Sequence, residues 1–250
     1  MKNQIKKIIN SFGFEINKIP KGKKVLQTQQ DAFVIQKFLF RNFKSEVVIF
    51  DVGSYVGEIA LKYNNIFKKS KIYCFEPFKE SFSILEKNTT IHKNIICYNT
   101  AFSNSGGKAN FNANVAPYTN SLLKTCLQAE ETWGKKLLDT KETLEIDVTT
   151  IDDFMSKEKI LVIDILKLDT QGAEFLIIEG AKKTLQNGKI KIIYTEILAL
   201  PTYQDQKLMH ELIGTLYSFG FELFNFYNPS YTEKGQLRQV DAIFIYSKAF

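Results

Sequence analysis

Two short segments carry residues whose types and spacing suit a nucleotide-like ligand. In VIFDVGSYVG an apolar run ends at Asp51, and Gly53 and Gly57 follow it. In IYCFEP a second apolar run ends at Glu76 and Pro77. A strand that passes through glycines into a helix is typical of a nucleotide-binding turn, and an acid at the tip of the next strand can accept hydrogen bonds from both hydroxyls of a ribose.

The spacing of the glycines distinguishes between classes of nucleotide-binding site. Dinucleotide sites use G-x-G-x-x-G and phosphate loops use G-x-x-x-x-G-K-[ST], and neither pattern occurs here. A ligand with a ribose but no phosphate fits better, and S-adenosylmethionine (SAM) is such a ligand. In this interpretation Gly53 permits backbone angles that a side chain would obstruct, and Asp51 holds the ammonium group of SAM directly or through water. The alternative is an ordinary strand–turn–helix with Asp51 as a cap.

Further cofactor contacts are expected at the same turn and at the end of the next strand. Pro77 fixes the chain where it leaves the strand that ends in Glu76. Small residues at the end of the third strand leave room for an adenine ring. The predicted cofactor-binding residues are Asp51, Gly53, Ser54, Tyr55, Gly57, Glu76, Pro77, Thr100 and Ala101.

Two acids are candidates for a general base. Asp169 ends an apolar run within LKLDTQGAE, and Glu196 ends the next one. Ligands bind at the carboxyl edge of open α/β sheets, so two carboxylates at neighbouring strand tips could share the removal of a proton. Asp169 is the first candidate and Glu196 the second. The alternative for Asp169 and Glu174 is a helix start, which acids favour. A divalent metal held by these acids is less favoured, and no metal ligand is predicted.

The composition bounds the class of protein. The 250 residues are 44% apolar, enough for one sizeable core, and no run of eighteen apolar residues occurs. The start lacks the apolar segment and cleavage site of a secretory signal. Cys74, Cys97 and Cys126 are widely spaced, which indicates free thiols in a reducing cytoplasm. A cytoplasmic location is therefore predicted.

The net charge of +6 is concentrated in the N-terminal residues. Residues 1–24 hold seven lysines and one acid, whereas basic and acidic side chains balance in the rest of the chain. A neutral body argues against nucleic acid as a partner. Residues 4–14 read as an amphipathic helix, which either packs on its own domain or contacts the inner membrane surface or an anionic glycolipid as a peripheral segment.

Runs rich in β-branched residues alternate with helical patterns, which predicts an α/β fold with a doubly wound, mostly parallel sheet. Two alternating runs end the chain and predict a C-terminal antiparallel strand pair. The expected strands are 47–51, 71–75, 95–99, 109–113, 144–148, 164–169, 189–196, 221–227 and 239–246. The expected helices are 28–43, 58–67, 79–87, 150–154, 174–186 and 205–219.

The predicted domain organisation is a helical arm and lead-in at 1–45, followed by a SAM-binding domain at 46–250. An insert is expected at about 102–147, partly helical over 121–142. It carries Tyr118 and Trp133, which either pack normally or cover the acceptor.

Taken together, the motifs resemble the FkbM-type methyltransferases from about Val47 to the C-terminus. The matching segments are DVGSYVGE, FEP, TAFSNSGG, TTIDDF, LKLDTQGAE, EGAKKTL and the strand that ends in TEI. That family is SAM-dependent, and its known members mostly methylate hydroxyls of sugars, polyketides or related products. The resemblance implies cofactor binding at Asp51, Gly53, Gly57 and Glu76 and an active-site position for Asp169.

The chain departs from the family pattern at two places. Ser54-Tyr55 stands where the family commonly has Ala-Asn, and Gln171 stands where a glutamate is often seen. The tyrosine could change how the methionine end is held or reach toward the substrate. The glutamine weakens any role that needs an acid at that position.

The sequence thus predicts a SAM-dependent O-methyltransferase that acts on a sugar hydroxyl in a glycan or glycoconjugate. Methylation of a small metabolite such as a polyketide, and a non-catalytic SAM-binding module in glycan assembly, remain alternatives. An RNA or protein methyltransferase is disfavoured by the neutral body and by the absence of an asparagine-proline-proline-aromatic tetrad. A nicotinamide oxidoreductase is disfavoured by the missing third glycine. The oligomeric state stays open.

Overall fold

The computed structural model describes residues 31–133 and 136–249. The predicted helix over 4–14 and the proposed membrane contact of residues 1–24 lie outside the described residues. None of the described helices is long and apolar enough to cross a membrane.

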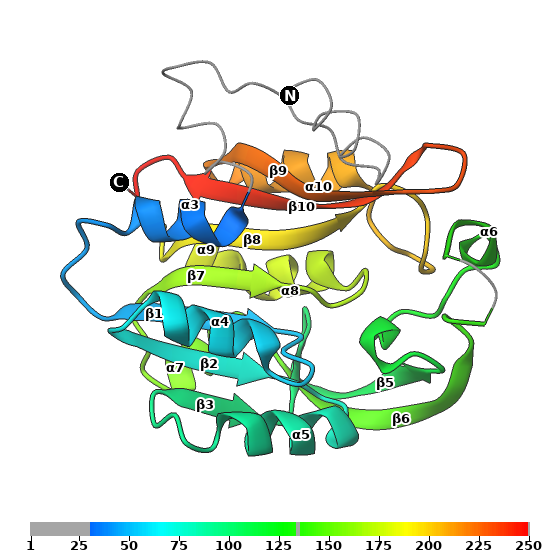
Figure 1. Cartoon of the computed structure of the whole chain (residues 1–250), viewed down its shortest axis with the longest axis horizontal. Coiled ribbons are helices and arrows are strands. Elements are labelled where there is room, and N and C mark those ends of the chain that lie inside the picture. Colours follow the sequence, from blue (N-terminus) through cyan, green and yellow to red (C-terminus); the bar gives the residue numbers. More distant parts are fainter. Residues whose placement is uncertain (1–30, 134–135, 250) are drawn as a thin grey trace, which may run out of the picture.

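The main sheet has seven strands in the order β3-β2-β1-β7-β8-β10-β9 (Figure 1). The strands from β3 to β8 pair in parallel, and β10 is antiparallel to both β8 and β9. This confirms the predicted doubly wound sheet with a C-terminal antiparallel pair. The bounds are β1 Val47–Val52, β2 Ser70–Phe75, β3 Ile95–Tyr98, β7 Ile163–Leu168, β8 Ile190–Leu198, β9 Phe221–Tyr231 and β10 Leu237–Tyr246.

Helices cover both faces of this sheet because alternate strand residues point to opposite sides. Ile49 of β1 belongs to the core under α3, α4 and α5, whereas Phe50 belongs to the core under α7, α8, α9 and α10. The bounds are α3 Ala32–Leu39, α4 Glu58–Ile66, α5 Lys79–Thr89, α7 Ile151–Lys157, α8 Glu174–Gly180, α9 Lys182–Gln186 and α10 Met209–Ser218. The β1-to-β7 junction is where the winding reverses, and such a switch point is the usual place for a ligand.

A second sheet of three strands, in the order β4-β6-β5, stands beside the carboxyl ends of the main strands (Figure 1). The expected strands at 109–113 and 144–148 are present within it and are longer than predicted. Of the partly helical stretch expected over 121–142, only α6 is helical among the described residues. The bounds are β4 Ala101–Phe102, β5 Gly107–Asn114, η1 Pro117–Thr119, α6 Ala129–Trp133 and β6 Thr140–Thr149.

Three predicted helices are wrong in their extent. The expected helix over 174–186 is broken at Ala181, whose φ of −105° and ψ of 11° depart from helical values. The preceding Gly180 packs so closely on Ser103 that a Cβ at Gly180 would be 2.1 Å from the Ser103 carbonyl oxygen. The helix expected over 205–219 begins only at Met209, since Asp205 has a left-handed φ of 59° that no helix allows. The helix expected over 28–43 ends at Leu39.

Candidate active site

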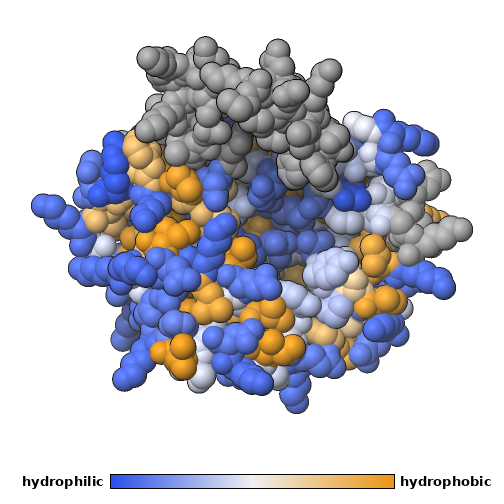
Figure 2. Space-filling model, viewed as in Figure 1, coloured by the Kyte–Doolittle hydropathy of each residue, from blue (hydrophilic) through white to orange (hydrophobic). Residues whose placement is uncertain are grey.

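A cavity of about 240 Å³ opens at the carboxyl ends of β1, β2 and β7. The second sheet, η1 and the loop after η1 form its opposite wall with Phe111, Tyr118 and Leu122. Figure 2 shows hydrophilic residues gathered around a recess near the centre of this face. The cavity therefore combines a polar floor at the switch point with an apolar wall from the insert, which is typical of small-molecule sites.

The turn after β1 forms one wall of the cavity. Gly53 has a φ of 74°, and its N–H and that of Ser54 donate to the carbonyl of Phe75 at 3.0 and 3.1 Å. A Cβ at Gly53 would be 1.9 Å from the backbone oxygen of Asp169, so only glycine fits between the two loops. Gly57, with a φ of 91°, does not line the cavity and instead is the N-cap residue of α4.

Glu76 lines the cavity and is buried, with 7% of its surface exposed. Its two carboxyl oxygens each accept one backbone N–H, from Tyr55 and from Phe78, both at 2.9 Å. A carboxylate can accept about four hydrogen bonds, so two acceptor positions remain, which is the number that a ribose diol needs. Burial raises the pKa of Glu76 to about 7, although the two backbone hydrogen bonds oppose the rise.

We expect the affinity for S-adenosylhomocysteine (SAH), the demethylated product of SAM, to fall by about tenfold between pH 8 and pH 6. Hydroxyl donors favour the ionised carboxylate, so at pH 6 most of the free protein must first release the proton of Glu76. Calorimetric titration in two buffers of different ionisation enthalpy measures both the affinity and the released proton.

The variant Glu76→Gln should bind SAH at least tenfold more weakly than the wild type, with no dependence on pH over this range. Glu80→Gln changes an exposed acid of α5 and is the matched control. Equal wild-type affinity at pH 6 and pH 8 would contradict the assignment of Glu76 to the ribose.

The predicted adenine end of the cavity is lined by Pro77, Ala101 and Phe102. Thr100 does not line it, because its hydroxyl faces away and donates to the carbonyl of Asp147 at 2.9 Å. The small side chain of Ala101 and the buried ring of Phe102 leave an apolar surface suited to a flat base. Together with Glu76, these residues fit an adenosine.

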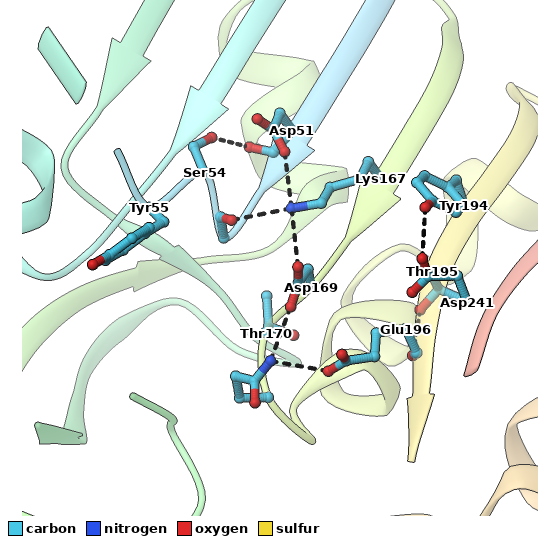
Figure 3. Close-up of polar contacts among 12 residues, drawn as sticks. Asp51, Ser54, Tyr55, Lys167, Asp169, Thr170, Tyr194, Thr195, Glu196 and Asp241 are labelled. Carbon is cyan, nitrogen blue, oxygen red and sulfur yellow. Dashed lines mark hydrogen bonds and ion pairs between the residues drawn. The ribbon is translucent and has the colours of Figure 1, made fainter. Parts of the chain in front are cut away.

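Asp51 lies beneath the cavity and does not line it. It faces Lys167 across the β1–β7 ladder, and the Lys167 Nζ is 3.1 Å from Asp51 Oδ1 (Figure 3). Burial raises the pKa of Asp51, and Lys167 opposes the rise. Burial lowers the pKa of Lys167, but Asp51 and Asp169 outweigh it, so that pKa is raised. The lysine is therefore charged and compensates the buried acid, and the contact of Asp51 with the SAM ammonium stays a prediction.

Lys167 also connects the turn to the candidate base. Its ammonium donates to the carbonyl of Gly53 at 3.1 Å and is 3.6 Å from Asp169 Oδ2. The Asp169 side chain is 42% exposed and lines the cavity, whereas that of Lys167 is 5% exposed. Asp169 directly follows β7, which ends at Leu168 and not at Asp169 as predicted. Of this charged trio, Asp169 is the carboxylate that solvent and ligands can reach.

The structure brings the two predicted base candidates together. Gln171 Nε2 donates to Asp169 Oδ1 at 3.0 Å and to Glu196 Oε2 at 2.9 Å. Glu196 lies outside the cavity lining and also accepts from Gln239 at 2.8 Å. Burial, followed by the nearby Asp169 carboxylate, raises the pKa of Glu196 well above its usual range. Asp169 is thus the member of the pair that faces the cavity.

Lys167 is absent from the predicted site residues, and no role was predicted for Gln171. A signal for Lys167 was present, since it is the one cation in the apolar run DILKLD and stands two residues before Asp169, on the same strand face. The two aromatic residues of the insert differ in their positions. Tyr118 lines the cavity. Trp133 packs its ring under Arg238 and donates from Nε1 to Thr202 at 3.0 Å. Among the residues that the structure describes, no group of three or more potential metal ligands occurs.

Comparison with known proteins bears directly on this site. The sequence model of the methyltransferase FkbM domain matches residues 51–223. The 2-O-methyltransferase NoeI of Sinorhizobium fredii is 25% identical over 182 residues, which cover 70% of this chain and 73% of that protein. Methyltransferase 1 of Beauveria bassiana is 22% identical over 189 residues, covering 70% and 75%.

Among solved structures, the precorrin-6y C5,15-methyltransferase of Geobacter metallireducens superposes with a TM-score of 0.46 at 11% identity, over 85% of this chain and 86% of that one.

The match to the FkbM domain spans well over half of the chain, from Asp51 through both base candidates, and confirms the resemblance seen in the motifs. The chain belongs to the FkbM methyltransferase family and is a SAM-dependent methyltransferase.

Proposed function

We propose that the protein transfers the methyl group of SAM to a hydroxyl of a sugar unit in a glycan or glycoconjugate. The observation that carries the proposal is one cavity that holds both the buried carboxylate of Glu76 and the half-exposed carboxylate of Asp169. The name of the relative NoeI, a 2-O-methyltransferase, supports oxygen as the accepting atom.

Different residues would hold the two ends of SAM in this cavity. Glu76 would hold the ribose, and the turn at Gly53 would lie against the methionine end. When bound, SAM supplies an electrophilic methyl group. Holding two reactants in line lowers the barrier by up to about 7–11 kcal/mol in favourable cases.

Asp169 is the proposed general base. A sugar hydroxyl is a weak nucleophile, and a positioned base that accepts its proton typically accelerates such a step by about 10²–10⁴-fold. Glu196 is the second candidate. It lies behind Gln171, and its raised pKa favours the protonated form, which cannot accept a proton.

The test is transfer of tritium from labelled SAM to a panel of p-nitrophenyl glycosides, with a polyketide alcohol, bulk RNA and a mixed protein acceptor as comparison substrates. We expect label in at least one glycoside as an alkali-stable methyl ether. Label in the alcohol, the RNA or the protein alone would contradict the sugar assignment. SAH binding without transfer to any acceptor would favour a non-catalytic module.

A further inference from the structure

We propose that Gln171 is a positioning residue that holds Asp169 and Glu196 as one unit and turns the Asp169 carboxylate toward the acceptor. The inference rests on the proposed role of Asp169 as the base. It gives a function to the glutamine that replaces the glutamate often seen at this place in the family.

Both polar atoms of the Gln171 side chain and its backbone oxygen have hydrogen-bond partners. Its Nε2 donates to Asp169 and to Glu196, and its Oε1 accepts from the Tyr203 hydroxyl at 3.3 Å. Its backbone oxygen accepts from the Ser121 hydroxyl at 2.7 Å. The side chain is therefore held by the loop after β7, by β8 and by Tyr203 in the loop after β8, while the insert holds the backbone of Gln171.

The backbone around Gln171 indicates that this placement is imposed by the fold. Gln171 has a left-handed φ of 54°, which is costly for a residue with a side chain. The following Gly172, with a φ of 92°, lies against Tyr203 so closely that a Cβ would be 2.7 Å from the Tyr203 ring. Strain of this kind persists where the surroundings over-determine a residue, and it concentrates at functional sites.

Asp169 is anchored through both of its oxygens. Gln171 holds Oδ1 at 3.0 Å, and the Lys167 ammonium lies 3.6 Å from Oδ2 (Figure 3). Two anchors of different direction leave the carboxylate little freedom to rotate, and its unused lone pairs remain available on the exposed side. A base held in this way is oriented before the acceptor binds, which is what an in-line reaction requires.

The amide of Gln171 can hold both acids of this chain without adding charge. The Nε2 carries two hydrogens, one for each carboxylate, and no charge. In this chain a carboxylate at the same place would offer no hydrogen to either neighbour and would add a further acidic group beside Asp169 and Glu196. Like-charged neighbours repel and disfavour the ionised state that a base needs.

The test uses Gln171→Glu, which keeps the shape and removes both donors, and Gln171→Met, which removes them without adding charge. Gln186→Glu makes the same change on the exposed end of α9 and is the control. We expect both Gln171 variants to retain the SAH affinity of the wild type within threefold. We expect kcat for the methylated glycoside to fall at least 30-fold with KM for SAM unchanged, and more for Gln171→Glu than for Gln171→Met.

Crystal structures of the SAH complexes of these proteins provide a readout without an acceptor. In both Gln171 variants the Asp169 and Glu196 carboxylates should move apart or rotate, while SAH stays in place. Unmoved carboxylates, an unchanged kcat, or a parallel loss of SAH affinity and kcat would each overturn the positioning role. If the wild type methylates no acceptor, the proposed function fails, and the crystal structures alone decide the role of Gln171.

Discussion

Replacing Asp169 with asparagine is expected to lower the rate of methyl transfer by about 10²–10⁴-fold, the range that a positioned general base contributes. The change removes one acceptor oxygen and the charge while keeping the size of the side chain. Affinity for SAH should stay within a few-fold, because the ribose carboxylate of Glu76 and the turn at Gly53 are unchanged. Turnover with the methylated glycoside and calorimetry with SAH measure the two effects separately.

The control is Asp153→Asn, which alters an exposed acid in the first turn of α7, outside the lining of the cavity. Glu196→Gln is the informative comparison. If Asp169 is the base, Glu196→Gln should reduce turnover less than Asp169→Asn does. Full activity in Asp169→Asn together with its loss in Glu196→Gln would transfer the role of base to Glu196.

Much of the fold could be predicted from local sequence patterns, because the structure forms the same elements that these patterns indicate. The apolar runs that became β1, β2, β7 and β8 are each buried on both sides, so their composition alone marks them as central parallel strands. The turn at Gly53 and the acid at Glu76 were predictable for the same reason, since each follows directly from the end of such a strand.

What the sequence could not show depends on contacts between distant segments. The break between α8 and α9 lies next to Gly180, which packs against the Ser103 carbonyl 77 positions earlier in the chain, and no local sequence pattern predicts that contact. The role of Gln171 depends on its reach to Glu196 on the next strand and on the Tyr203 hydroxyl. The burial of Asp51 is of the same kind, because a carboxylate at the end of a strand is ordinarily near solvent and this one is matched by Lys167.

Replacing Lys167 with methionine should destabilise the fold by about 3–5 kcal/mol, the usual cost of leaving one member of a buried ion pair without its partner. Asp51 is fully buried, and Lys167 is the cation that contacts it. For a protein of this size the change corresponds to a fall in Tm of about 6–20 °C. Thermal unfolding followed by circular dichroism measures the loss.

The double variant Asp51→Asn/Lys167→Met separates the ion pair from simple packing. With no charge left to bury at this position, it should recover most of the stability that Lys167→Met loses, since a neutral pair often replaces a buried ion pair at little cost. A double variant as unstable as Lys167→Met would show that the lysine acts through packing or through its bond to Gly53, and not through Asp51.

The dependence on pH gives an independent check with a defined sign. Burial already raises the pKa of Asp51, and removal of Lys167 takes away the group that opposes the rise. The folded variant then binds a proton at Asp51 more readily than the unfolded chain does, so acid favours its folded state. The stability gap between wild type and Lys167→Met should therefore shrink as the pH falls from 8 to 5. For Asp51→Asn/Lys167→Met the gap should change less with pH, because the Asp51 carboxylate is gone and only the smaller effects of losing Lys167 on Glu76 and Glu196 remain. A gap for Lys167→Met that is constant across this range would mean that Asp51 is not the group left uncompensated.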